Sequence, residues 1–439
     1  MTRAAASSAA GRAAGVRHAM ADRLRADGWI VSDVVEAAFR AVPREVFMPP
    51  GTSLEDAYGA GESVITKQAA DGRNLSSVSA PWVQARMVAQ AVLQPGMRVL
   101  EVGSGGCNAA ILAEVTGPSG RVVSVDIDPE ITAPAAAALE AAGYGGRVTV
   151  VTADAEHGVP EFAPYDAIIV TAGAWDVPPA WIGQLAAGGT LVVPLRFNGV
   201  TRSVAFWRSR SHLVSTSAQA CGFVPVQGAG TRPEQVIEIP HPRGPVRLLF
   251  EDGAPEVLDV PADVLDTAPA AAYSGISIGN QVSFADLYLW LAGLPGFCRV
   301  SAQDQALLAG HGGGPGTGKS WFPFGIVAGD SFAYLWLRPV EGSDPPLREF
   351  SAWGYGPHAQ QAAAEFADAV REWDRRGRDL PGNAFAYWPD GSGTARMPAG
   401  AVVFPKAHGA ATITWPGPDG YAGRAQGLVT GPAEILDRR

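Results

Sequence analysis

Two acidic residues follow apolar segments at the spacing of a nucleoside-binding site. Residues 98–102 have the apolar pattern of a buried strand and contain Glu101, and Gly103 and Gly105 come directly after them. Glycines at such positions let the backbone turn sharply and approach a ligand closely. A second apolar segment, residues 122–126, ends in a carboxylate twenty-five residues after Glu101. An acid roughly 20 residues beyond a glycine loop accepts hydrogen bonds from ribose hydroxyls, so the pattern predicts a nucleoside-bearing cofactor.

S-Adenosyl-L-methionine fits this pattern better than a dinucleotide. A dinucleotide site requires a third glycine where this chain has Asn108, so that the helix can pack closely on its strand. Glu101 would repel a pyrophosphate, whereas its carboxylate suits a cationic methionine group. Asp154, which follows another apolar segment, can accept the adenine amino group. The alternative for the glycine segment is an ordinary glycine-rich turn in an unrelated α/β protein. The alternative for Asp154 is an ordinary loop aspartate.

Ser77 and Ser79 are candidate ligands for a substrate carboxylate. Residues two apart in an extended segment point the same way, and the helix that we expect from Trp82 follows Pro81 directly. Hydroxyls and backbone N–H groups at a helix start can together hold an anion. The alternative is a serine helix cap followed by proline, which is common in proteins.

The elements that position these residues alternate along the chain. Apolar segments predict strands at 98–102, 121–126, 147–152, 165–171 and 189–195, with helices at 108–116, 129–142 and 177–186 between them. Such alternation is typical of an α/β fold with a parallel sheet and helices on both faces. Helical spacing before residue 98 predicts an N-terminal helical cap.

Composition shifts divide the chain into three expected parts. Residues 1–17 are rich in alanine and serine and are expected to form a disordered tail without a secretory signal. Residues 18–235 are expected to form the cofactor-binding catalytic domain. Beyond a loop-rich junction, the mixed pattern predicts a C-terminal α+β domain over 236–439.

Charge and composition limit the possible partners. The formal net charge of −10 provides no basic surface for nucleic acid. The chain has only three cysteines, Cys107, Cys221 and Cys298, which are too far apart for a disulfide framework, and no metal site is expected. No run of about 18 apolar residues is present, so we expect no membrane span and a cytoplasmic protein.

Residues 313–320 satisfy the phosphate-loop expression GxxxxGK[ST]. Such a loop binds phosphates only between a strand and a helix. Residues 307–312 resemble no strand, and Pro323 prevents a regular helix beyond its first turn. We therefore expect a mobile loop here, not nucleotide triphosphate hydrolysis.

Five segments in order resemble protein L-isoaspartyl O-methyltransferases over about residues 18–230. They are Val-Pro-Arg-Glu-Val-Phe-Met-Pro at 42–49, Val-Ser-Ala-Pro at 78–81, Val-Leu-Glu-Val-Gly at 99–103, Ala-Pro-Tyr-Asp-Ala-Ile-Ile-Val-Thr-Ala at 163–172 and Gly-Gly-Thr-Leu-Val-Val-Pro at 188–194. The resemblance implies a Rossmann-like S-adenosylmethionine-dependent methyltransferase fold. It also implies that Ser79, with Ser77 beside it, is the functional serine of a loop between cofactor and substrate carboxylate.

The expected cofactor-binding residues come from the same comparison and from the glycine turn. They are Val78, Ala80, Gln84, Glu101, Gly103, Ser104, Gly105, Asn108, Asp126, Ile127, Asp154, Ala155 and Thr171. The chain departs from the family at Cys107, where glycine is usual, and at Ala153 and Ala155, where the family has Gly-Asp-Gly around the aspartate. These changes add side chains near the expected cofactor.

The long extension beyond residue 235, together with residues 172–179, resembles a subgroup found with ribosomal peptide maturation systems such as those of lanthipeptides and graspetides. The resemblance implies methylation of an aspartate in a modified precursor peptide, after which the ester collapses to an aspartimide. One alternative is an isoaspartyl repair enzyme with an accessory domain, and another is a binding module without activity. The expected partner is thus a peptide or protein that contains aspartate or isoaspartate; the oligomeric state stays open.

Overall fold

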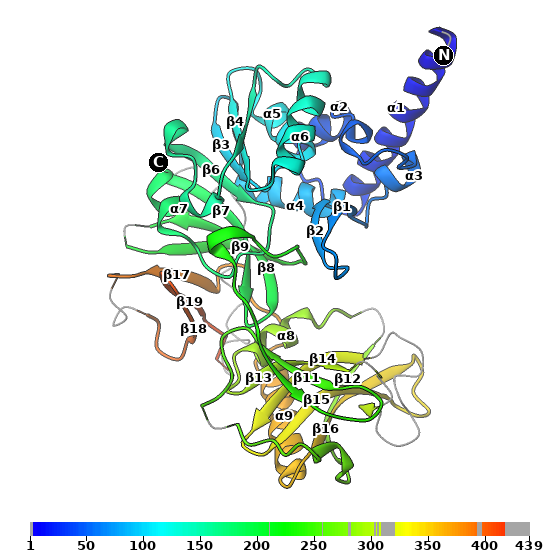
Figure 1. Ribbon diagram of the computed structural model, residues 1–439, viewed down its shortest axis with the longest axis vertical. Coiled ribbons are helices and arrows are strands. Elements are labelled where there is room, and N and C mark those ends of the chain that lie inside the picture. The colour runs from blue at the N-terminus through cyan, green and yellow to red at the C-terminus, as the bar shows by residue number, and fades with distance from the viewer. Residues whose placement is uncertain are drawn as a thin grey trace.

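Two large β-sheets, one above the other in Figure 1, organise the chain. The computed structural model describes residues 3–417 except 210, 257, 280–281, 303, 305–306, 309–320 and 393–396. The first sheet has ten strands and the second has seven. A separate hairpin, β1 (Val64–Gln68) and β2 (Asn74–Val78), lies beside the first sheet.

Five parallel strands form one half of the first sheet, from its edge at β5 inward, as the alternating sequence pattern predicts. They are β3 (Arg98–Val102), β4 (Arg121–Asp126), β5 (Val148–Thr152), β6 (Tyr165–Val170) and β7 (Leu185–Phe197). Their spatial order is β5-β4-β3-β6-β7. The strands are rich in valine and isoleucine because parallel strands are buried on both faces.

Helices cover both faces of this parallel half. One face carries the predicted N-terminal cap and the helices that follow it: α1 (Arg3–Ala26), α2 (Asp33–Ala41), α3 (Leu54–Ala57), α4 (Pro81–Ala91), α5 (Cys107–Thr116) and α6 (Pro129–Ala141). The short helix α7 (Pro179–Gln184) packs on the other face through buried Trp181. The expectation of a disordered tail over 1–17 is wrong for residues 3–17, which belong to α1, because alanine favours helix.

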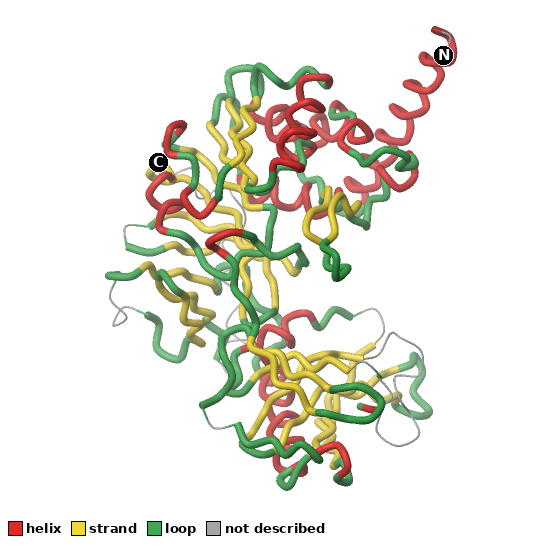
Figure 2. The backbone as a smooth tube through the Cα atoms, in the orientation of Figure 1, coloured by secondary structure: helices red, strands yellow, loops and turns green. Residues whose placement is uncertain are grey.

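The first sheet continues into antiparallel strands, which are yellow in Figure 2, and the colours of Figure 1 show that they come from two distant parts of the chain. β8 (Val200–Arg208) and β9 (Leu213–Ala220) follow β7, and then β17 (Phe385–Pro389), β19 (Gly409–Ile413) and β18 (Val402–Lys406) complete the order. β17 pairs with β9 at Tyr387↔Leu213. The C-terminal strands therefore return to the first sheet, although the sequence pattern assigned them to the domain beyond residue 235.

The second sheet confirms a mixed α and β region beyond residue 235. Its strands are β10 (Gln235–Ile239), β11 (Val246–Phe250), β12 (Ala270–Gly279), β13 (Phe297–Ala302), β14 (Trp321–Ala328), β15 (Ser331–Pro339) and β16 (Leu347–Tyr355). All neighbours pair antiparallel in the order β10-β11-β13-β14-β15-β16-β12. Helix α9 (Ala359–Arg375) packs on this sheet through Phe366, Val370 and Trp373, and α8 (Ala285–Ala292) lies beside it.

Two sequence-based expectations concern residues of this region. The phosphate-loop expression at 313–320 lies outside the described residues, and the next described element, β14, is a strand and not the helix that a phosphate loop requires. Within the described ranges, no helix combines the length and apolar character needed to cross a membrane.

One apolar core joins the two sheets. Leu100 of β3 and Phe206 of β8 belong to the same buried cluster as Leu335 of β15 and Phe350 of β16. Phe404 of β18 completes it. Buried side chains on both sides of residue 235 therefore share one core. That the parts before and after residue 235 are separate domains stays a prediction.

Residues 172–179 hold the additional chain against the first sheet. Trp175 donates its indole N–H to Asp252 Oδ1, which lies beyond β11, at 2.6 Å. Asp176 Oδ1 accepts from the Tyr387 hydroxyl at 2.6 Å, and its Oδ2 accepts from the backbone N–H of His408 at 2.8 Å. The segment that resembles the peptide-maturation subgroup is therefore the contact point for the extra strands.

We predict that Tyr387→Phe destabilises the whole first sheet. The substitution removes the donor to Asp176 and leaves a half-buried acceptor with one partner fewer, which costs about 1 kcal/mol. Urea unfolding followed by circular dichroism should show the transition at lower urea concentration. Tyr273→Phe, at a half-exposed tyrosine of β12, is the control. Equal midpoints for Tyr387→Phe and the wild type would contradict the prediction.

Candidate functional site

A small pocket surrounds the turn after β3, where the sequence pattern predicts the cofactor. This turn pocket has a volume of about 70 Å³. Seven expected cofactor residues line it: Gly103, Ser104, Gly105, Asp126, Ile127, Ala155 and Thr171. They come from the carboxyl ends of four neighbouring parallel strands, which is where ligands bind in open α/β sheets.

The turn itself leaves room only for glycine at position 103. Gly103 has φ +97°, and a Cβ there would lie 2.5 Å from Thr171 Oγ1. The Thr171 hydroxyl faces the carbonyl groups of Val102 and Gly103 at 3.0 and 3.1 Å and donates to them. The side chain after β6 thus fixes the backbone that approaches the ligand.

Asp126 and Ser104 supply polar groups to the turn pocket. Asp126 Oδ2 accepts from the Ser104 N–H at 3.1 Å, and Oδ1 accepts from the Asp128 N–H at 3.0 Å. The Ser104 hydroxyl is buried and has no hydrogen-bond partner among the residues that the structure describes. A buried hydroxyl without a partner is costly, so this group fits a ligand that accepts or donates a hydrogen bond there.

Glu101 is buried behind the turn pocket and is not one of its lining residues. It accepts hydrogen bonds from Asn108 Nδ2 at 2.9 Å and from the Ser124 hydroxyl. Burial raises the pKa of the Glu101 carboxyl to about 7, although these two hydrogen bonds favour the ionised form. A cationic ligand nearby would reverse the effect of burial.

Five other expected cofactor residues also lie outside the lining of the turn pocket. Val78 and Gln84 are buried, and Asn108 bonds to Glu101. Asp154 Oδ2 accepts from the Ala229 N–H at 2.8 Å, so residues 228–230 cover this carboxylate. Their contacts with a cofactor, and that of Ala80 in the neighbouring pocket, stay predictions.

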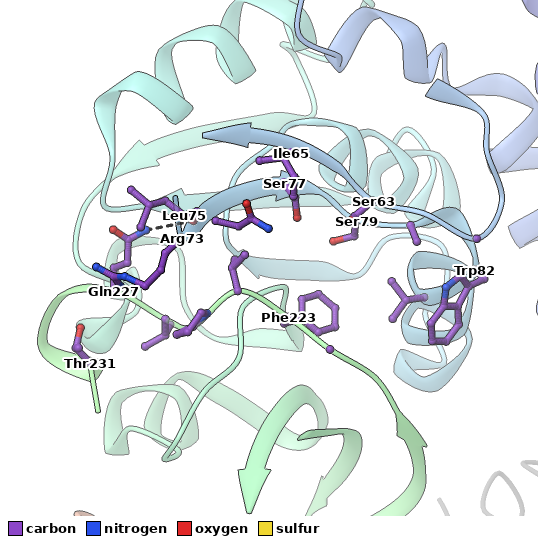
Figure 3. Close-up of a pocket in the computed structure, with 18 residues that line it drawn as sticks. Ser63, Ile65, Arg73, Leu75, Ser77, Ser79, Trp82, Phe223, Gln227 and Thr231 are labelled. Carbon is purple, nitrogen blue, oxygen red and sulfur yellow. Dashed lines mark hydrogen bonds between the residues drawn. The ribbon is translucent and has the colours of Figure 1, made fainter. Parts of the chain in front are cut away.

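A larger pocket of about 730 Å³ opens beside the turn pocket, and we call it the serine pocket. Ser77 and Ser79 both line it, whereas Val78 between them is buried, as the alternation of an extended segment predicts. Figure 3 shows the two serines on one wall, with Phe223 on the opposite wall. The structure thus brings both predicted serines together next to the predicted cofactor site.

The serine pocket is mostly apolar and suits an anion better than a cation. Ile65, Leu75, Trp82 and Phe223 supply much of its surface. Arg73 is the one charged side chain among the described lining residues. Its Nε donates to Asp71 Oδ2 at 2.7 Å, so this cation is already paired with a carboxylate that lies outside the lining. An acidic ligand therefore meets mainly hydroxyl groups, and no lining carboxylate repels it.

Sequence reasoning missed the segment that separates the two pockets. Residues 224–227 line both, and the Gln227 amide donates to the Leu75 carbonyl at 3.4 Å across the gap (Figure 3). The segment belongs to no named strand, and an isolated parallel bridge pairs Pro225 with Gly173. No titratable or repeated residue in the segment could have indicated its role.

Arg44 is the second residue that sequence reasoning left without a role. It is 3 % exposed, and its guanidinium donates to the carbonyl of Ser79 at 2.8 Å. Arg44 lies in the segment 42–49, which carries part of the family resemblance, but only the fold shows which groups it contacts. Among the described residues there is no group of histidine, cysteine, aspartate or glutamate that could hold a metal ion.

Comparison with known proteins identifies relatives of the first 230 residues. A family model described as Protein-L-isoaspartate(D-aspartate) O-methyltransferase matches residues 16–231. The Protein-L-isoaspartate O-methyltransferase of Hyperthermus butylicus is 38% identical over 227 residues, which cover 48% of this chain and 88% of the relative. The enzyme of the same name from Pyrobaculum neutrophilum is 42% identical over 179 residues, covering 40% and 83%. A solved protein-L-isoaspartate O-methyltransferase aligns with a TM-score of 0.47 and 21% identity over 84% of this chain and 95% of that one.

We predict that Glu101 makes the stability of the ligand-free protein depend on pH. The folded chain keeps this carboxyl protonated up to pH about 7, whereas the unfolded chain ionises it near its ordinary pKa of ~4.3. The stabilisation is therefore complete below the unfolded value and is lost as the pH rises through 7. Between pH 5 and 7 the free energy of unfolding should fall by up to about 1.4 kcal/mol per pH unit from this group.

Urea unfolding at pH 5, 6, 7 and 8 measures this slope. Glu101→Gln should flatten it, because glutamine does not titrate, and Glu55→Gln at an exposed position of α3 should not. Parallel curves for the wild type and Glu101→Gln would show the prediction to be wrong.

Proposed function

The chain belongs to the protein-L-isoaspartate O-methyltransferase family, and we propose that it methylates the side-chain carboxylate of an isoaspartyl residue in a protein or peptide. It is a carboxyl O-methyltransferase that uses S-adenosyl-L-methionine. The observation that carries the substrate proposal is the serine pocket, which lies directly beside the turn pocket. Its described lining residues include the hydroxyls of Ser77 and Ser79 and no acid, and its one cation, Arg73, is paired with Asp71 outside the lining.

The residues of the turn pocket fit the cofactor. The Asp126 carboxylate suits ribose hydroxyls, and the buried Ser104 hydroxyl, which has no partner among the described residues, gains one when a polar ligand is present. Glu101, held by Asn108 and Ser124, supplies negative charge behind the turn for a cationic group. When bound, the cofactor supplies an electrophilic methyl group.

The acceptor needs orientation more than activation. A side-chain carboxylate has a reference pKa of ~3.9 and is ionised at neutral pH, so no general base is required. Ser77 and Ser79 can donate hydrogen bonds to it, and the apolar walls around Trp82 exclude water. Holding reactants in line can lower a barrier by up to about 7 to 11 kcal/mol.

A second substrate is favoured by the additional chain. Residues 232–417 lie beyond the matched family segment, yet they share a core with it and contact residues 172–179. We infer that this region selects a ribosomally made, modified precursor peptide, and that the methylated residue is then an ordinary aspartate. The amide nitrogen of the following residue attacks the ester carbonyl, a C–N bond forms, the C–O bond breaks, and methanol leaves with the amide proton to give an aspartimide.

Ser79→Ala tests the acceptor site. We expect turnover to fall about 10- to 100-fold, because a hydrogen bond to a charged group contributes about 1.5 to 3 kcal/mol, while affinity for S-adenosylhomocysteine stays unchanged. Ser63→Ala is the matched control, since Ser63 lines the same pocket outside the expected loop. Methyl transfer from labelled cofactor measures turnover, and unchanged turnover in Ser79→Ala would refute the assignment.

Mass spectrometry distinguishes the two substrates. Methylation of a short isoaspartyl peptide, with no change in its aspartyl counterpart, supports the isoaspartyl proposal. Gain of one methyl group on a co-expressed cyclised peptide, or net loss of water after methanol has left, supports the precursor proposal. The full chain should be used, because deletion beyond residue 235 would remove strands of the first sheet.

A further inference from the structure

Arg44 connects the loop of Ser79 to three other elements. Its Nη2 donates to the Ser79 carbonyl at 2.8 Å, and its Nε donates to the Ala57 carbonyl at 2.6 Å. Its Nη1 donates to Gln84 Oε1 at 2.7 Å and lies 3.7 Å from the Cys107 thiol. One side chain thus holds the end of α3, the segment between β2 and α4, the first turn of α4 and the start of α5.

The same hydrogen bonds reach the cofactor strand. Gln84, which accepts from Arg44, donates through Nε2 to Asn108 Oδ1 at 3.5 Å. Asn108 in turn donates to Glu101 at 2.9 Å. A continuous series of hydrogen bonds between buried and half-buried groups therefore runs from the carbonyl of Ser79 to the carboxyl of Glu101.

The partners of Arg44 are uncharged. Within the part of the chain that the structure describes, this guanidinium forms no salt bridge with a carboxylate. A buried cation is costly to leave without strong partners, so three close hydrogen bonds have to compensate. The planar fork of arginine can donate in several fixed directions at once, which the single ammonium group of lysine cannot do.

We propose that Arg44 is a positioning residue that sets the acceptor loop at Ser79 in register with the cofactor strand at Glu101. The proposal rests on the proposed methyl transfer to a carboxylate. Ser79 donates to the acceptor from its side chain, while its carbonyl is held by Arg44, so the backbone that carries the hydroxyl keeps its place. The Cys107 thiol provides an additional contact with the Arg44 guanidinium.

Arg44→Lys in the full chain tests the proposal. We expect kcat for methyl transfer to a short isoaspartyl peptide to fall about 10- to 100-fold, as for the loss of buried charge-assisted hydrogen bonds, with little change in the affinity for S-adenosylhomocysteine. Amide hydrogen exchange of residues 76–80 should become faster, while exchange in β3 and β4 stays as in the wild type.

Arg147→Lys is the matched control. Arg147 also donates to a backbone carbonyl, that of Ala113, but it precedes β5 at the opposite edge of the parallel strands. Wild-type kcat and wild-type exchange at 76–80 in Arg44→Lys would overturn the proposal, as would faster exchange over the whole first sheet, which indicates a general structural role. If the wild type methylates no peptide, the proposed function fails, while the exchange measurement still reports on Arg44.

Discussion

The arrangement of the molecule depends on one apolar layer that three distant parts of the sequence share. Strands β3 and β6–β8 contribute one side of it, β15, β16 and α9 the other, and the C-terminal strands close it. Burial of apolar surface is the main favourable term in folding, so neither sheet can be removed without exposing the other. The C-terminal segment that closes this layer also forms hydrogen bonds with residues 172–179, close to the carboxyl end of β6.

Backbone conformation and hydrogen bonds together fix the turn after β3. The positive φ of Gly103 and the contact with Thr171 fix the backbone, and the N–H of Ser104 then reaches Asp126. Glu101 lies on the same strand two residues before the turn, in a fully buried position where its charge is costly without a partner. Contacts within the protein thus fix this turn, which reduces the cost of ordering it on binding.

The sequence predicted what local patterns determine. Parallel strands, helices α4–α6, the glycine turn and the direction of Ser77 and Ser79 follow from periodicity and glycine placement, and the structure confirms them. The pairing of Tyr387 with Leu213 could not be predicted, because strand partners distant in sequence leave no local signal. Residues 224–227 and Arg44 were missed for a related reason: their roles come from contacts with carbonyl groups and with pocket space, which no residue pattern records.

Residues 224–227 form a common wall of the turn pocket and the serine pocket. Any displacement of this wall by a molecule in one pocket changes the shape of the other. Binding in the two pockets is then thermodynamically linked, and such linkage is reciprocal. The dissociation constant of either ligand therefore depends on whether the neighbouring pocket is occupied, and it should be reported together with that occupancy.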